Sequence, residues 1–194
     1  MHRLLALAAL ALALAVPSAA QDTFVIENVR TFSGGMMGGS GPFTLVSLRD
    51  GSVVVEPDAA ARADSASAAW DVGLRGNEVV INGGASGPGG LRAALLDADF
   101  DALDALPEGA TLLADGERDC PRGAATVVCH GSGNGWYSYE ANGVQPIPGK
   151  VLVIERPDGS AVKVRFLRYT LGADLGGPRP RFVTLEAAPL APAE

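Results

Sequence analysis

Short runs in which every second residue is apolar dominate this chain. Trp70, Val72 and Leu74 form one run, and a second run over residues 79–81 follows the turn pair Gly76-Asn77. A period of two places the apolar side chains on one face of an extended strand. Glycine followed by a small polar residue between two such runs is typical of a tight turn. The pattern therefore predicts two strands joined as a β-hairpin.

Similar apolar segments recur along the chain, with turn residues between them. Asp50-Gly51 and Pro157-Asp158-Gly159-Ser160 each separate two such segments, and both favour a tight turn with positive φ at glycine. The remaining predicted strands span residues 24–29, 43–48, 52–56, 111–113, 126–128, 136–139, 151–156, 161–169 and 181–185. We expect residues 187–194 to be a frayed tail. Many short strands with glycine-rich turns indicate an antiparallel, β-sandwich-like fold.

One segment has a different period. Between Leu91 and Leu106, apolar residues recur at intervals of three and four, which is typical of an amphipathic helix. Pro107 would end such a helix. The predicted fold class is therefore mostly β, with one short helix.

The N-terminal 20 residues have the pattern of a secretory signal peptide. An apolar run from Leu4 to Val16 is followed by small residues, which favours cleavage before Gln21. We expect residues 1–20 to be removed on export and residues 21–194 to form a single domain. No cysteine lies near the cleavage position, so we expect no lipid anchor. No later segment has the about 20 apolar residues of a membrane span, so the predicted location is the periplasm, the outer-membrane surface or the medium.

The charge of the chain restricts its partners. Fifteen Lys and Arg residues stand against 22 Asp and Glu residues, for a net charge of −7. Nucleic-acid binding depends on neutralising phosphates with basic side chains. The acidic balance therefore argues against nucleic acid and against docking on anionic lipid.

The chain has two cysteines, Cys120 and Cys129. An exported chain meets an oxidising environment, which favours a disulfide between them. A metal or redox pair is the alternative, but the spacing matches neither CxxC nor a zinc ligand pair. We expect a structural disulfide.

Two blocks of sequence have a residue order that strand periodicity alone does not require. The first consists of Trp70-Asp71-Val72 and the segment Ile81-Asn82-Gly83-Gly84-Ala85-Ser86-Gly87. The second begins at Gly135-Trp136-Tyr137-Ser138-Tyr139 and continues through Val151-Leu152-Val153-Ile154-Glu155-Arg156. Both blocks resemble the HmuY family of exported proteins from Bacteroidetes-type bacteria, and the resemblance covers about residues 43–90 and 135–184. It implies the HmuY-type fold and a binding protein rather than an enzyme.

The resemblance also implies heme as the ligand, gripped between two axial side chains that are His in some members and Met in others. Aligned on Gly135-Trp136, one family ligand position falls at Ala141, which cannot bind iron. His130, with Met36 or Met37, is then the candidate for a rebuilt ligand pair. The ordinary alternatives are an exposed histidine beside the disulfide and apolar loop methionines. A metal ligand or a catalytic base at His130 stays open, although no GxSxG motif accompanies it.

Three further motifs give weaker indications. The spacing of a calcium loop is found at Asp97, Asp99, Asp101 and Glu108, although Ala102 stands where the turn needs glycine. The alternative for these residues is a solvated acidic helix face.

The loop at 83–90 lacks the Lys-Ser/Thr end of a phosphate loop. Basic residues at 163, 165 and 168 form either a small patch or a solvated face. No carboxylate pair for glycoside hydrolysis stands out.

The predicted function is capture of heme for uptake, with an outer-membrane receptor as a possible recipient. The alternative is an interaction or structural module of the cell envelope that keeps the fold without binding heme. The loss of a ligand at Ala141 and the scarcity of histidine favour this alternative.

Overall fold

The computed structural model describes residues 23–31, 41–56, 66–172 and 180–191. The predicted signal peptide and the loop with Met36 and Met37 lie outside these residues. The regular elements of the described part are strands, and they pair antiparallel, as the sequence predicts. The predicted fold class is confirmed in this respect.

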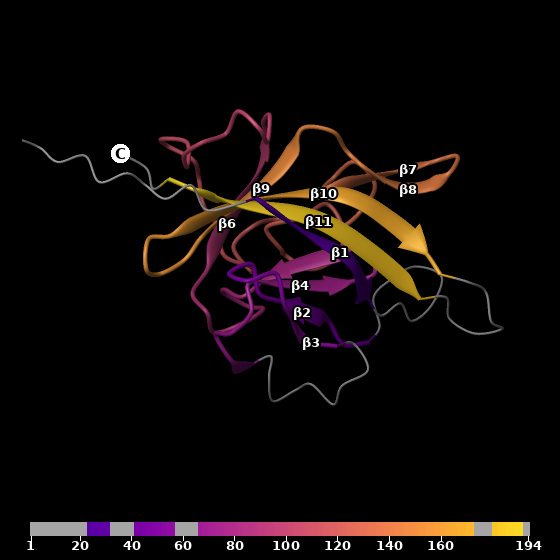
Figure 1. The fold of residues 1–194 in the computed structure, drawn as a ribbon, viewed down its shortest axis with the longest axis horizontal. Coiled ribbons are helices and arrows are strands. Elements are labelled where there is room, and N and C mark those ends of the chain that lie inside the picture. Colours follow the sequence, from indigo (N-terminus) through magenta and orange to yellow (C-terminus); the bar gives the residue numbers. More distant parts are fainter. Residues whose placement is uncertain (1–22, 32–40, 57–65, 173–179, 192–194) are drawn as a thin grey trace, which may run out of the picture.

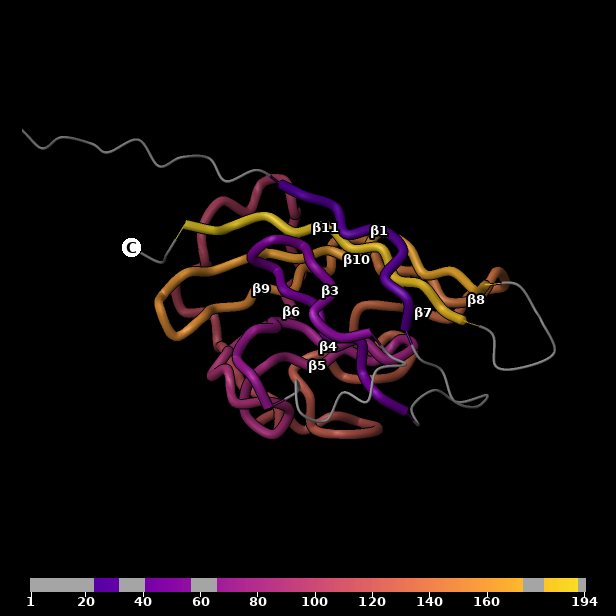
Figure 2. Tube along the Cα trace, turned by 60° about the horizontal axis from the view of Figure 1, so that its bottom comes forward, coloured from indigo at the N-terminus to yellow at the C-terminus, as the bar shows by residue number. Residues whose placement is uncertain are grey.

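Two sheets and a separate hairpin make up the described fold (Figure 1). The large sheet has the order β1 (Phe24–Thr31), β11 (Arg181–Leu190), β10 (Ala161–Leu171), β9 (Lys150–Glu155) and β6 (Arg92–Asp97). The small sheet has the order β3 (Val53–Val55), β2 (Thr44–Val46), β4 (Val72–Arg75) and β5 (Glu78–Ile81). The hairpin consists of β7 (Tyr137–Glu140) and β8 (Gly143–Pro146), and β8 lies beside β10 (Figures 1 and 2).

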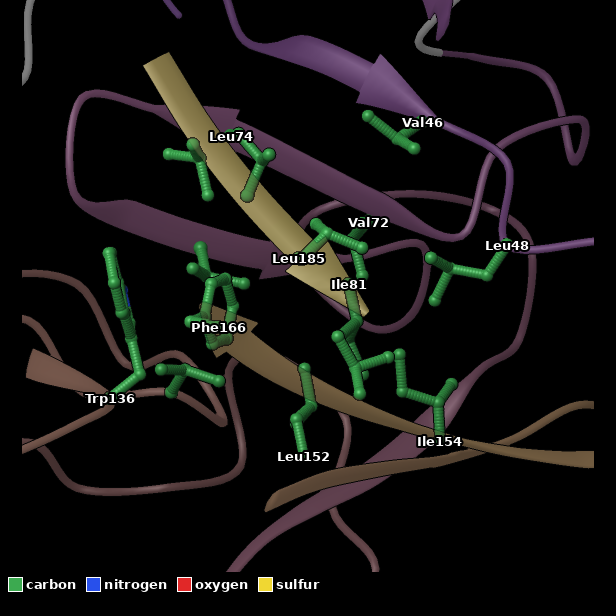
Figure 3. Packing of buried hydrophobic residues seen from close by; sticks show 14 of the residues in the cluster. Val46, Leu48, Val72, Leu74, Ile81, Trp136, Leu152, Ile154, Phe166 and Leu185 are labelled. Atoms are coloured by element: carbon green, nitrogen blue, oxygen red, sulfur yellow. The ribbon is translucent and has the colours of Figure 1, made fainter. Parts of the chain in front are cut away.

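The main hydrophobic core lies between the two sheets (Figure 3). Val72 and Leu74 enter it from β4, and Leu152 and Leu185 enter it from the large sheet. Trp136, which directly precedes β7, stacks on Phe166 of β10 with 4.3 Å between ring centroids. This stacking fixes the base of the β7–β8 hairpin against the large sheet.

The predicted helix from Leu91 to Leu106 is wrong. Residues 92–97 form β6, which pairs with β9 over its whole length. Leu95 packs against the main core, whereas Leu96 packs against a second cluster on the other face of the large sheet. Phe100 and Leu106 belong to that second cluster. Apolar residues recur here at intervals of three and four because two different elements supply them. The first is β6, and the second is the loop after β6, which covers one face of the large sheet.

Three other predicted segments also differ. Around the cysteine loop, Leu113 makes only an isolated bridge with Ala93, and residues 126–128 are buried without belonging to a strand. The expected frayed tail is part of β11 as far as Leu190, which pairs with Ala161. The C-terminal residues 187–190 are ordered by pairing with β10, a long-range contact that local sequence does not encode.

The Trp-Asp and Asn-Gly-Gly segments, which carry the resemblance to the HmuY family, make an ion pair and hydrogen bonds within the fold. Asp71, just before β4, accepts a 2.8 Å hydrogen bond from Nε of Arg156, just after β9, so this buried ion pair joins the two sheets. Asn82 donates to the carbonyl of Trp70 and accepts from the amide of Gly89. A Cβ at position 89 would lie 2.7 Å from Cγ of Asn82, which explains the glycine.

Candidate ligand-binding site beside His130

A cavity of about 270 Å³ lies between the β4–β5 hairpin and the loop that carries the disulfide. Its apolar lining residues are Phe43, Val79, Val80, Ala124 and Val128. Its polar lining residues are Arg75, Glu78, Ser86, Thr126 and His130. Apolar walls with a few polar groups are the usual composition of a small-molecule site.

His130 is half-buried at this cavity, and its ring makes a hydrogen bond to a side chain. Its ring Nε2 lies 3.1 Å from Oδ1 of Asn77, the turn residue between β4 and β5. The amide nitrogen of Asn77 donates to Oη of Tyr139 at 3.2 Å. The carbonyl of Asn77 accepts from Nε1 of Trp136 at 2.9 Å. Asn77 therefore ties the small sheet to His130 and to the β7–β8 hairpin.

The loop that forms one wall of the cavity is closed by the predicted disulfide between Cys120 and Cys129. Asp115 fastens the same loop to the small sheet, because its carboxylate accepts from the amides of Val127 and Ile81 at 2.8 and 2.9 Å. Burial raises the pKa of Asp115, and these hydrogen bonds oppose that shift. The disulfide and this carboxylate together hold His130 at the cavity.

Tyr137 supports the loop from the core side. Its ring centroid lies 6.1 Å from that of His130, and its Oη accepts from the amide of Gly131 at 3.1 Å. Burial raises the pKa of Tyr137 to about 12. Its phenol therefore stays neutral at physiological pH.

Arg75 provides a positive charge at the cavity. Its guanidinium bonds to the carboxylate of Glu78 and lies 4.3 Å from the ring centroid of Phe43. Both contacts hold the guanidinium beside the apolar wall. An anionic group on a bound ligand could compete with Glu78 for this cation.

Of the predicted site residues, His130 alone lines the cavity among the described residues. Met36 and Met37 lie outside them. Ala141 is exposed in the turn between β7 and β8 and does not line the cavity. Sequence reasoning missed Asn77, because the Gly-Asn pair indicated only a turn.

Two of the four acidic residues with calcium-loop spacing, Asp97 and Asp101, pair with cations. Asp97 lies 2.6 Å from Nζ of Lys150, and Asp101 lies 3.3 Å from the guanidinium of Arg165. Within the described ranges, no three His, Cys, Asp or Glu residues are grouped to hold a metal ion. The acidic helix face of the alternative interpretation is also wrong, because Asp97 is the last residue of β6 and Asp99 and Asp101 lie in the loop that follows it.

The predicted basic patch is divided between surface and interior. Lys163 is buried, and its Nζ donates to the carbonyls of Phe100 and Leu103 at 2.6 and 2.8 Å. Arg165 bonds to Glu186 at 2.6 Å, and this pairing is the main reason that its pKa is raised. Arg168 is exposed. These cations stabilise the large sheet and its covering loop.

Comparison with known proteins identifies the family. The family model described as HmuY protein matches residues 42–180. The chain belongs to the HmuY family. No curated protein matches it. This membership confirms the resemblance carried by the two sequence blocks.

Several solved structures are similar to this HmuY-family chain. Apo PinO from Porphyromonas gingivitis is 17% identical, with 89% of this chain and 99% of that chain covered and a TM-score of 0.49. A protein from Bacteroides vulgatus described as HmuY-like and heme binding is 18% identical, with 92% of this chain and 96% of that chain covered and a TM-score of 0.45. The apo HmuY analog from Tannerella forsythia is 13% identical, with 89% and 100% covered and a TM-score of 0.40.

No helix with the length and apolar character of a membrane span occurs in the described part of this family member.

Proposed function

We propose that this HmuY-family protein is an exported binding protein that captures heme beside His130. In this proposal residues 1–20 are the signal peptide, residues 21–194 are a single binding domain, and the captured heme is passed on for uptake, with an outer-membrane receptor as a possible recipient. The observation that supports it most is an imidazole at an apolar-lined cavity, with one ring nitrogen held by Asn77 and the other free of hydrogen bonds to described residues. The family membership supports a binding protein rather than an enzyme.

The residues at the cavity fit one side of a heme. His130 is the single imidazole outside the predicted signal peptide, and a neutral imidazole is a common axial ligand of heme iron. The proposal takes the second axial ligand from Met36 or Met37. Both lie outside the described residues, which include no methionine. When bound, heme would supply an iron with open axial positions. Binding through Nε2 would require the ring to leave Asn77, whereas binding through Nδ1 would not.

The remaining cavity residues suit the rest of the ligand. Phe43, Val79 and Val128 would pack against the apolar porphyrin. Arg75 would pair with a propionate carboxylate in exchange for Glu78. The cavity, at about 270 Å³, is smaller than the roughly 300–1,000 Å³ of pockets that enclose a drug-sized ligand, so heme would stay partly exposed.

A second candidate is a cell-envelope interaction module that keeps the fold without heme. Ala141 favours it, because this exposed alanine stands where the family resemblance implies an iron ligand. In such a protein, His130 would serve only to join Asn77 to the disulfide loop.

The test is an equilibrium titration of the purified protein with hemin, followed by the Soret band in the oxidised and reduced states. We expect a saturable one-to-one change. His130→Ala should weaken binding by at least the about 10–100-fold that loss of a ligand's supporting residue costs in metal sites. Arg168→Ala is the matched surface control, because Arg168 is exposed and does not line the cavity, and its affinity should equal that of wild type.

An unsaturable Soret change in the wild type would overturn heme capture. Equal affinity in wild type and His130→Ala would overturn the site. The interaction module predicts the first of these results. Met36→Ala and Met37→Ala test the second ligand in the same titration, and a loss of affinity in one of them would identify it.

A further inference from the structure

The side chain of Asn77 contacts the ring of His130 and is itself held in place by the surrounding fold. Its side chain is 2% exposed, and it follows Gly76, which has a φ of +59° in the turn between β4 and β5. The carbonyl of Asn77 accepts from the indole of Trp136, which is itself buried in the main core. The turn joins two paired strands, because Arg75 at the end of β4 is in register with Glu78 at the start of β5. The side-chain amide of Asn77 is therefore held before any ligand binds.

The two polar atoms of this amide have different partners. The amide nitrogen Nδ2 donates to Oη of Tyr139 at 3.2 Å, and Oδ1 lies 3.1 Å from Nε2 of His130. In this orientation of the amide the carbonyl oxygen faces the ring, and because a carbonyl oxygen only accepts, we infer that Nε2 of His130 carries the ring proton. In a neutral imidazole the other nitrogen, Nδ1, then holds the lone pair.

We propose that Asn77 is the positioning residue that fixes His130 in the Nε2–H tautomer and so leaves the lone pair on Nδ1 for a metal centre. In metal sites a ligating histidine commonly donates its other N–H to a carbonyl or carboxylate, which fixes the tautomer and raises the basicity of the ligating nitrogen. Asn77 gives His130 this arrangement. The identity of the metal centre as heme iron rests on the proposed function, whereas the control of the tautomer does not.

The tautomer is read directly from the ¹⁵N shifts of the imidazole. Spectra of the purified ¹⁵N-labelled protein should show, for the neutral ring, a protonated Nε2 and an unprotonated Nδ1. The signals are assigned by their absence in His130→Ala. Asn77→Ala removes the acceptor, so we expect a mixture of the two tautomers. Asn77→Asp keeps an acceptor for Nε2–H, so it should restore the wild-type tautomer.

Tyr139→Phe is the matched control. It removes the hydroxyl that accepts from Nδ2 of Asn77 and keeps the Asn77 amide itself, so Oδ1 is still available to the ring of His130. Tyr139 is 60% exposed, so the change should not disturb the core. We expect the wild-type tautomer in this variant. A protonated Nδ1 in the wild type, or an unchanged tautomer in Asn77→Ala, would overturn the proposal.

Hemin titration of the same variants separates the two proposals. We expect Asn77→Ala to lose about 10–100-fold in affinity and Asn77→Asp to recover most of it. If the wild type binds hemin and Asn77→Ala binds it equally well, the positioning role is overturned. If the tautomer depends on Asn77 but the wild type does not bind hemin, control of the tautomer stands and the proposed function is overturned.

Discussion

Loss of the Asp71 carboxylate should destabilise this protein more than an average substitution. The side chain of Asp71 is 3% exposed and that of Arg156 is 7% exposed, so both charges of the pair are buried. Nη2 of Arg156 is also buried and has no hydrogen-bond partner in the described part of the chain. In Asp71→Ala the guanidinium would remain buried without its anion. Breaking a buried pair in this way costs about 3–5 kcal/mol.

A second loss follows from the other carboxylate oxygen. Oδ2 of Asp71 accepts a 2.6 Å hydrogen bond from the buried amide of Leu48. An amide left without an acceptor costs about 1–3 kcal/mol. The two costs overlap because the site can relax, so we expect Asp71→Ala to lower the free energy of unfolding by about 4–6 kcal/mol. This loss is a large part of the free energy of unfolding of a typical domain, which is about 5–15 kcal/mol.

The assay is urea unfolding at pH 7, followed by the fluorescence of Trp70 and Trp136, which are both buried. The double variant Asp71→Asn with Arg156→Met is the matched comparison. Asparagine keeps an acceptor for the amide of Leu48, and methionine removes the charge, so most of the lost stability should return. A loss below about 1 kcal/mol in Asp71→Ala would refute the reasoning, because it would mean a solvated pair. A double variant as unstable as Asp71→Ala would refute it too.

Two further predictions concern the loop beside the cavity. Replacing Cys120 and Cys129 by serine opens a loop with a sequence separation of 9, so the free energy of unfolding should fall by about 2.5–3 kcal/mol in the chain-entropy model. Urea unfolding of the wild type with and without reductant is the check, and equal midpoints would contradict it. Tyr137 has a folded pKa of about 12, raised from 10, so its contribution to stability is complete below pH 10 and is lost as the pH rises through 12. The wild type should therefore lose about 2–3 kcal/mol more than Tyr137→Phe between pH 10 and 12, and equal losses in urea titrations would count against this.

The hairpins could be predicted because short-range chemistry determines them. Gly51 and Gly76 have φ values of +73° and +59°, and each lies between paired strands as the turn signals indicate. The helix prediction failed because residues 92–97 pair with β9, more than 50 residues later in the chain. Apolar spacing is ambiguous when a strand is followed by a loop that covers its sheet, and the tertiary pairing then decides.

The candidate site could be predicted only in part. His130 stands out in the sequence because no other histidine lies outside the predicted signal peptide. Its partner Asn77 is 53 residues away, and their contact depends on how the small sheet meets the disulfide loop. The Trp-Asp motif indicated the family, but Asp71 joins the sheets and lies outside the cavity lining. The roles of Met36 and Met37 stay predictions.

The most direct test of heme capture is a crystal structure of the protein with hemin, with the iron located by its anomalous scattering. We predict an iron peak within bonding distance of the His130 imidazole and a porphyrin plane against Phe43 and Val128. An iron peak elsewhere on the protein, or crystals grown with excess hemin that hold none, would contradict the account.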